Sequence, residues 1–495
     1  MSESTRHPRI NYWFWTDKTL KNKEYLKTLD RIAGESSFDV LTLTDRGCDF
    51  WDPIHKETFS ELVTHAHEKN IKIVIQLWTR GFVETGTTRV DVSEAGAIAL
   101  DVETTVENGR AVIRSCDKFA RGVDKAPCIE SEFIYAAVFK KNSDGYYEAG
   151  TLVDVTEKIN VVYSSPDRVS AYLDLPEYEG YTVFAIAAHY HRMADVFSDR
   201  MVADYKEFMD YYSDVALDGI ALDEFRGLSI ILGFSEEMPL RFRIYGRSFA
   251  KEFLKRTGRD LHRTMLDMRY CPNGQDDVRA EAINLYFDVY RRGVVRTEHF
   301  VADYSKQIFG KDAFLGFHNT FHNSLTNDEI WQTGCAWWEL KRDYAQTDEN
   351  MIFPVRLALA CQTKENIHYD MYYNSDIETF FEKAINDAAF GGRIHYHAID
   401  DVGRWGADTG RSEFLSEVSR YEREVELLNR FDPAGLPKMS LLAVFGFPAL
   451  CNWYPKWENR SIFDINSEFD AMELSRALWN DGYHHALAPD DAIID

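Results

Sequence analysis

The sequence is poor in the features that mark secreted and membrane-bound proteins. Its 495 residues include seven cysteines, an odd number without a C-x-x-C pair, which favours reduced thiols over a disulfide framework. Residues 1–9 are polar and lack the apolar core of a secretion signal. No apolar run approaches the roughly 18 residues that a membrane span needs. These absences predict a soluble, cytoplasmic protein.

Basic residues and common cofactor motifs are also scarce. Lysine and arginine number 56 against 81 aspartates and glutamates, a formal net charge of -25. Nucleic acids and anionic membranes bind basic surfaces, so we expect neither as a partner. The chain has no glycine-rich phosphate loop, no G-x-G-x-x-G after a strand and no serine nucleophile elbow. We therefore expect no cofactor.

A regular alternation of strand and helix patterns opens the chain. Apolar content of 45% and charged content of 28% are typical of a globular protein, and the length fits one large domain with additions. Strand patterns cover residues 10–15, 38–44 and 71–78, and helical patterns cover about 21–33 and 58–68. This spacing predicts parallel strands joined by crossover helices.

The rhythm changes over residues 96–192. Short alternating runs replace the helices, and turn sequences such as Asn108-Gly109 and Ser143-Asp144-Gly145 separate them. This pattern predicts an antiparallel β insert, a small sandwich carried on a loop of the parallel domain.

The parallel rhythm resumes at Asp199. A helix over 199–212 leads into the strand of residues 217–225, and a helical region follows over about 240–308, broken near Gly258 and at 271–274. Further strands are predicted at 313–319, 334–340, 366–373 and 392–399, with helices at 348–363, 376–390 and 412–430. Eight strands with intervening helices predict a (β/α)8 TIM barrel built from residues 1–95 and 193–432.

A further α/β unit follows the linker at 432–437. Residues 438–495 contain a strand at 439–445, a helix at 469–480 and the start of another strand after Gly482. The chain stops at Asp495 before such a unit could close a sheet, which favours a truncated, flavodoxin-like domain.

The fourth barrel strand ends in two adjacent carboxylates, Asp223 and Glu224. Burying a charge is costly unless it is paired, whereas the carboxyl end of a barrel strand is where catalytic residues lie. Capping of the next helix is the alternative. Other strand ends supply carboxylates, aromatic rings, histidines and amides: Asp17, Arg46, Trp78, His318, Asn319, Trp337, Trp338, Glu339, Asp370, Tyr372, His395 and His397.

This set of side chains is typical of a site that cleaves a glycosidic bond. Such a site needs one carboxylic acid to protonate the leaving oxygen and a second carboxylate as nucleophile or as base for water. We assign the acid to Glu224 and the second role to Glu339 or Asp370, with a slight preference for Glu339. Either could instead be a structural salt-bridge partner, for example of Arg342. The other residues would hold the sugar.

Two His-x-His pairs, His189/His191 and His395/His397, would each place both rings on one face of a strand. That arrangement suits a metal, but no matching third ligand is evident, so we expect polar contacts to substrate and no metal site. Two alternative functions stay open. One is a metal-dependent barrel hydrolase that uses these pairs, and the other is a non-catalytic, carbohydrate-binding barrel.

The position of Glu224 resembles that of the acid/base glutamate in the large clan of barrel glycoside hydrolases, where it also ends strand four. With the β insert and the unit beginning Met439-Ser440, the chain resembles the multidomain β-galactosidase-type enzymes of family 42, whose barrel precedes a flavodoxin-like trimerisation domain. Some rhamnosidase-like hydrolases also carry Asp-Glu at the end of such a strand, so the chain resembles them as well. The resemblance implies a glycosidase, a carbohydrate substrate and a homo-oligomer.

The chain departs from the clan's pattern at two positions. Asp223 occupies the position before the acid/base, where the clan usually has asparagine. Strand seven carries Asp370 where the clan has its nucleophilic glutamate. A retaining mechanism is therefore not carried over from the resemblance. An inverting mechanism with Glu339 or Asp370 as base remains open.

Overall fold

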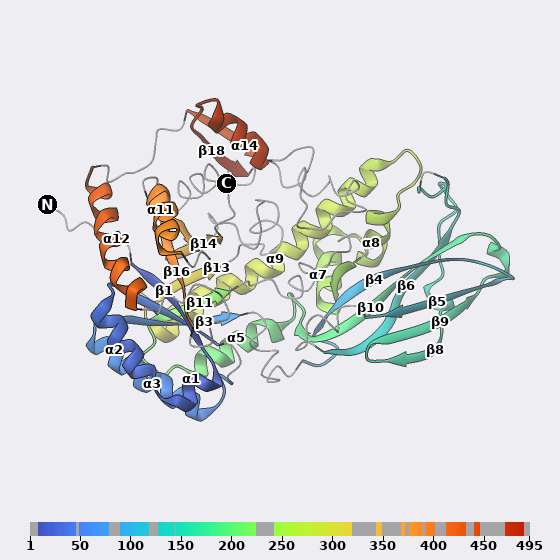
Figure 1. The fold of residues 1–495 in the computed structure, drawn as a ribbon. Helices are drawn as coiled ribbons and strands as arrows, with labels where there is room; N and C mark the ends of the chain where they lie inside the picture. Colours follow the sequence, from blue (N-terminus) through green and yellow to red (C-terminus); the bar gives the residue numbers. More distant parts are fainter. Residues whose placement is uncertain are drawn as a thin grey trace.

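The structure, a computed structural model, has a mixed α/β architecture with a parallel barrel at one end and a β-rich insert at the other (Figure 1). This confirms the predicted α/β class. No helix among the described residues is long and apolar enough to cross a membrane. The described residues are 8–45, 49–78, 90–117, 127–143, 145–223, 242–318, 343–348, 368–371, 376–388, 392–400, 412–431, 440–445 and 471–489.

Eight strands form the barrel. Each pairs in parallel with the next in chain order, and the last pairs with the first to close the ring. The strands are β1 (Ile10–Trp15), β2 (Val40–Asp45), β3 (Lys72–Trp78), β11 (Gly219–Asp223), β13 (Phe314–His318), β14 (Tyr344–Asp348), β15 (His368–Met371) and β16 (Gly392–Asp400).

Helices cover the outside of the barrel. In α3 the Asp52 side chain accepts a hydrogen bond from the backbone N of Ile54 at 2.9 Å, and Pro53 suits the first turn. Residues 319–342 and 349–367, where the fifth and sixth helices of a full (β/α)8 barrel would fall, lie outside the described residues. The described helices of this layer are α1 (Asp17–Asn22), α2 (Tyr25–Glu35), α3 (Pro53–Glu68), α5 (Asp199–Tyr211), α9 (Asp276–Phe309), α11 (Ile377–Ala388) and α12 (Ser412–Phe431).

Strand alternation divides each barrel strand between two environments. In β1 the rings of Trp13 and Trp15 belong to the outer core, where Trp15 stacks on Phe59 of α3 with centroids 5.1 Å apart. The alternate side chains point into the barrel, because successive residues of a strand face opposite sides. The amino-terminal end of the interior is filled by Ile10, Val40, Val74, Ala221, Phe314 and Tyr369.

The insert is a sandwich of two antiparallel sheets. Apolar residues from alternate positions of both sheets fill the space between them, among them Val183, Ala185 and Ala187. The larger sheet has the order β12-β4-β10-β6-β7 and the smaller β5-β9-β8. The strands are β4 (Ala95–Thr105), β5 (Arg110–Cys116), β6 (Cys128–Phe139), β7 (Val153–Asp154), β8 (Asn160–Ser165), β9 (Arg168–Asp174), β10 (Thr182–Ala194) and β12 (Phe242–Gly246).

Strand β12 corrects the predicted helical region, which was expected from about residue 240. It pairs antiparallel with β4 and adds an edge to the larger sheet. Arg243 of β12 is fully buried, and its guanidinium pairs with Asp101 of β4 and donates to the carbonyl of Met265 at 2.6 Å. Pairing of β12 with β4 therefore places this buried charge beside its partner. Helices then follow, with a break at Gly258 as predicted: α7 (Arg247–Thr257), α8 (Leu261–Arg269) and α9 (Asp276–Phe309).

The sixth barrel strand also differs from the prediction. Residues 334–340 lie outside the described residues, and β14 occupies the place between β13 and β15. Asp348 ends this strand and does not begin a helix. The apolar Trp337-Trp338 stretch has the stronger strand pattern, whereas β14 is mostly polar and is stabilised by pairing on both sides. The strand end that we assigned to Glu339 is therefore that of Asp348.

The C-terminal unit contains the predicted strand, helix and strand. Strands β17 (Leu441–Phe445) and β18 (His485–Pro489) pair in parallel, and α14 (Ala471–Asn480) lies between them in sequence. Ser475 of the helix and His485 of the strand are joined by a hydrogen bond of 2.6 Å.

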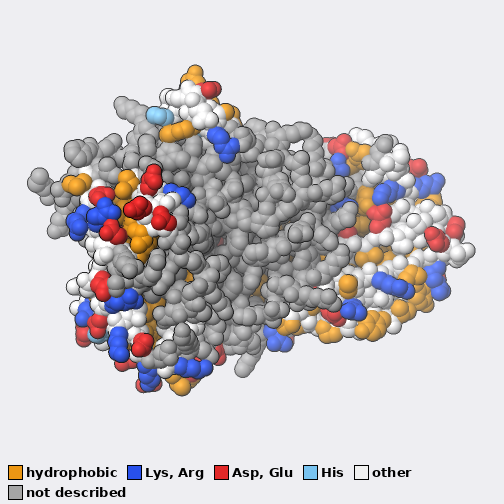
Figure 2. Space-filling model, in the orientation of Figure 1, with side chains coloured by type: hydrophobic (Ala, Val, Ile, Leu, Met, Phe, Trp, Pro, Cys, Tyr) orange, Lys and Arg blue, Asp and Glu red, His pale blue; other side chains and the backbone are white. Residues whose placement is uncertain are grey.

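On the face shown in Figure 2, lysines and arginines are interspersed with aspartates and glutamates over the described surface. The insert also exposes apolar side chains on β8, where Val161, Val162 and Tyr163 are all more than half exposed.

Candidate active site at the barrel mouth

The carboxyl ends of three adjacent strands bring predicted site residues into register. Asp223, the last residue of β11, pairs with Trp78 of β3 on one side and with His318 of β13 on the other. Asp45 ends β2 in register with Trp15 of β1. The backbone thus places a carboxylate position between an aromatic and a histidine position on the rim, as expected for residues that end parallel strands.

Apart from the histidines described below, the remaining predicted residues fall into two groups. Only the backbone is described for Asp17 at the start of α1, Asp370 in β15 and His397 in β16. The same holds for Asp223, Trp78 and His318. The other group lies outside the described residues: Arg46, Glu224, Asn319, Trp337, Trp338, Glu339 and Tyr372.

The register places the carboxylate positions of β14 and β15, Asp348 and Asp370, in different alternations. Asp370 pairs with Thr347 on one side and with Ile394 on the other, and the Ile394 side chain belongs to the outer core. Asp348 pairs with Met371, two residues after Tyr369, whose side chain fills the barrel interior. Because paired residues of parallel strands share a face, position 348 falls in the inner alternation and position 370 in the outer one.

A hydrogen-bonded polar layer lies within the barrel above its apolar base. The Nε2 of Gln76 donates to the Tyr12 hydroxyl at 2.6 Å, and the Gln76 carbonyl oxygen accepts from the Thr44 hydroxyl. Thr44 and Gln76 have no exposed surface. Polar groups at such depth are costly unless they are paired, and here the pairing is built from three neighbouring strands.

His395 completes this polar layer. Its ring stacks on Tyr12 with centroids 3.8 Å apart, and its Nε2 lies 3.3 Å from the Thr42 hydroxyl. The side chain is fully buried, so we place His395 beneath the mouth, supporting Tyr12. The interior therefore changes from apolar at its base to polar toward the carboxyl ends, which is the end where barrel enzymes carry out their chemistry.

Four residues of this layer are absent from the predicted site: Tyr12, Thr42, Thr44 and Gln76. A signal was present, because each is a polar side chain at an alternate position of an otherwise apolar strand. A barrel whose interior is only a packed core would carry aliphatic residues there.

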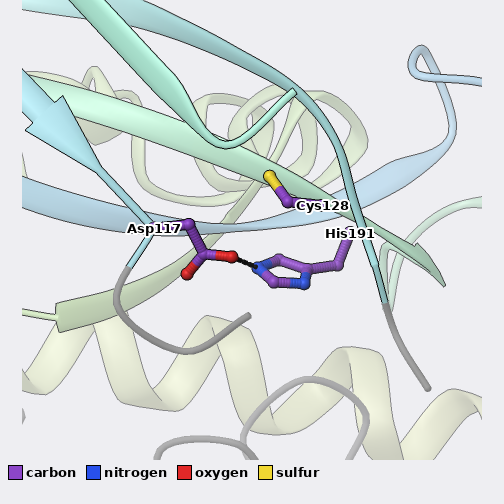
Figure 3. A group of neighbouring side chains, drawn as sticks. All are labelled: Asp117, Cys128 and His191. Atoms are coloured by element: carbon purple, nitrogen blue, oxygen red, sulfur yellow. Dashed lines mark ion pairs between the residues drawn. The ribbon is translucent and has the colours of Figure 1, made fainter. Parts of the chain in front are cut away.

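The other histidine pair lies in the insert. His189 of β10 is fully buried between two hydroxyls, with Ser115 Oγ 2.8 Å from its Nε2 and Ser131 Oγ 2.7 Å from its Nδ1. Burial lowers the pKa of His189 to about 4, so the ring is neutral at pH 7. His191 faces Asp117, with Nε2 and Oδ2 3.4 Å apart (Figure 3). The structure therefore places the two His-x-His pairs in different sheets.

Comparisons with known proteins support the fold. No protein-family profile and no curated sequence matches the chain. Among solved structures, a rhamnosidase from Novosphingobium sp. PP1Y superposes with a TM-score of 0.52 at 9% identity, covering 99% of this chain and 64% of its own. A β-glucosidase superposes with a TM-score of 0.34 at 9% identity, covering 84% of this chain and 89% of its own.

The chain thus shares the fold of the rhamnosidase and spans 64% of that protein's length.

Proposed function

We propose that the protein is a glycoside hydrolase whose active site is the carboxyl end of a (β/α)8 barrel. The observation that carries this proposal is the register of Asp223 between Trp78 and His318, above the polar layer of Tyr12 and Gln76. Glu224 follows Asp223 directly in the sequence and is our general acid.

The chemistry of glycoside hydrolysis accounts for these residue types. A general acid must protonate the leaving oxygen, while a second carboxylate attacks the sugar or activates water. Aromatic faces and histidines at the rim suit the faces and hydroxyls of a sugar ring. The fold shared with a rhamnosidase supports the same class, and it makes a rhamnoside a substrate to test alongside a galactoside.

For the second carboxylate we propose Asp348, with Asp370 and Glu339 as the competing candidates. Asp348 ends β14 in the inner alternation, two strands from β11, whereas Asp370 shares its alternation with the outward-facing Ile394. We further propose a carbohydrate partner and, from the resemblance to family 42, a homo-oligomer formed through the C-terminal unit.

The test is release of nitrophenol from a panel of aryl glycosides that includes α-rhamnoside, β-galactoside and β-glucoside. Glu224→Gln should lower kcat/KM at least ~100-fold, the usual contribution of a general acid. Asp348→Asn should lower it comparably, and Asp370→Asn should have less effect. Glu57→Gln, an exposed carboxylate on α3, is the matched control and should retain wild-type activity.

Three outcomes would contradict these proposals. Absence of turnover on both the aryl panel and natural oligosaccharides would leave a carbohydrate-binding barrel. Full activity of Glu224→Gln would remove it as the acid. A larger loss in Asp370→Asn or Glu339→Gln than in Asp348→Asn would reassign the second carboxylate. The anomer released first, read by NMR, then separates inversion from retention.

A further inference from the structure

Three side chains of different chemistry meet in the insert, away from the barrel (Figures 1 and 3). Asp117 directly follows β5, Cys128 begins β6 and His191 lies on β10. One oxygen, one sulfur and one nitrogen atom of these residues all lie within 4.8 Å of one another. Carboxylate, thiolate and imidazole are the three ligand types that Zn²⁺ takes from proteins.

The spacing of the carboxylate and the imidazole fits a shared ion. Asp117 Oδ2 and His191 Nε2 are 3.4 Å apart, and both side chains are almost completely buried. Two ligands at about 2.1 Å from a tetrahedral Zn²⁺ are separated by about 3.4 Å. A Zn–S bond of about 2.3 Å places the sulfur about 3.6 Å from the other two ligand atoms, so the Cys128 sulfur needs to approach them by at most about 1.2 Å.

The backbone around the three ligands is already fixed. The N–H of Asp117 donates to the carbonyl of Asp167 at 2.8 Å, and the N–H of Arg192 donates to the carbonyl of Pro127 at 3.1 Å. The Pro166 carbonyl accepts from the Cys128 thiol at 2.8 Å and from Ser131 at 2.7 Å. A further oxygen thus lies beside the thiol and can complete the coordination, either itself or through water.

We propose that Asp117, Cys128 and His191 form a Zn²⁺ site that joins β5, β6 and β10. Binding would transfer the thiol proton to solvent, so that one thiolate, one carboxylate and one neutral imidazole surround the ion. The two negative charges balance the charge of Zn²⁺, and the buried complex is neutral. The ion also ties together the chain on either side of residues 118–126. This structural site is independent of the proposed glycosidase activity.

The test uses the full chain, stripped with a chelator and titrated with Zn²⁺ or Co²⁺ alone. We expect one ion per chain and, with Co²⁺, the charge-transfer absorption of a thiolate ligand. Cys128→Ser should abolish that absorption and weaken binding at least ~10-fold, because loss of even an outer-shell partner of a metal ligand costs about 10–100-fold in affinity. Cys116→Ser is the matched control, because Cys116 is an exposed cysteine next to Asp117, and it should leave the spectrum unchanged.

A second measurement needs no variant. In the wild-type chain, Zn²⁺ should slow alkylation of Cys128, read by mass spectrometry of its peptide, and leave Cys116 unaffected. Absence of stoichiometric binding, or a Co²⁺ spectrum without a thiolate band, would leave only the Asp117–His191 contact beside a thiol and overturn the proposal. Aryl glycosidase activity should persist in the chelated chain, so failure of this proposal and failure of the proposed function are distinguishable.

Discussion

Gly219, at the start of the strand that carries Asp223, permits the close pairing of two barrel strands. A Cβ added at Gly219 would lie 2.0 Å from the carbonyl oxygen of Phe314 and 2.6 Å from its backbone N. These are backbone atoms of the paired strand β13, so no side chain can move aside to relieve the contact. The same Phe314 N–H donates to the carbonyl of Asp218 at 2.7 Å, and this bond must break if the strands separate.

Gly219→Ala should therefore destabilise the barrel strongly. Overpacking costs about 1–3 kcal/mol, and a buried N–H left without its acceptor costs a further ~1–3 kcal/mol. We expect the free energy of unfolding to fall by about 3 kcal/mol or more. Urea denaturation followed by tryptophan fluorescence measures this fall, because no tryptophan lies between residues 79 and 330 and the insert does not contribute to the signal.

Gly34→Ala is the matched control. Gly34 lies in α2, and an added Cβ would meet nothing within 4 Å. Alanine is the better helix former, so this variant should be neutral or up to about 1 kcal/mol more stable. If Gly219→Ala unfolded at the same urea concentration as the wild type, the close approach of β11 to β13 would be refuted.

Two further predictions concern buried polar groups. Tyr12→Phe removes the acceptor of the Gln76 Nε2 bond and should lower the free energy of unfolding by about 1–3 kcal/mol in the same urea assay; an unchanged value would contradict the polar layer. The second concerns Glu422, whose carboxylate accepts a hydrogen bond from Tyr396. Burial raises the pKa of Glu422 to about 7, above its ordinary value near 4.3. Between about pH 4.5 and 7 the folded state keeps a proton that the unfolded state loses, so the free energy of unfolding falls as the pH rises. Glu422→Gln should remove this fall, so that from about pH 5 to pH 8 the variant gains about 3 kcal/mol in free energy of unfolding relative to the wild type. Parallel pH profiles of the two proteins would contradict the prediction.

Much of the barrel could be predicted from local patterns. The run of residues 10–15 matches β1 residue for residue, because an aromatic strand followed by a capped helix has few alternatives. Strand six could not be found in this way. Its stretch Tyr344–Asp348 is mostly polar, and what makes it a strand is pairing with β13 and β15, residues distant in sequence. Strand β12 likewise depends on Asp101, more than 140 residues away, as partner for Arg243.

The types of residue at the candidate site could be predicted from the sequence, but which of them share a face of the barrel could not. That carboxylates end strands such as β11 is visible in the sequence. Whether Asp348 or Asp370 shares the inner alternation depends on the register of β14 against β15, which no local pattern encodes. The metal-ligand pattern was incomplete for the same reason, because Asp117 and Cys128 become partners of His191 only when β5, β6 and β10 assemble.

The strand that ends in Asp223 is positioned from its other end. The Asp218 carboxylate accepts a hydrogen bond from the backbone N of Ile73 at 2.7 Å and lies 2.9 Å from Nε2 of His67, which ties the start of β11 to β3 and α3. Gly219 then brings the strand against β13. Residues at the amino end of β11, four or more positions before Asp223, thus set its height relative to Trp78 and His318. Because an error of about 1 Å in such a position can cost ~100-fold in rate, the fixed start of β11 matters to the proposed chemistry as much as the carboxylates at its end.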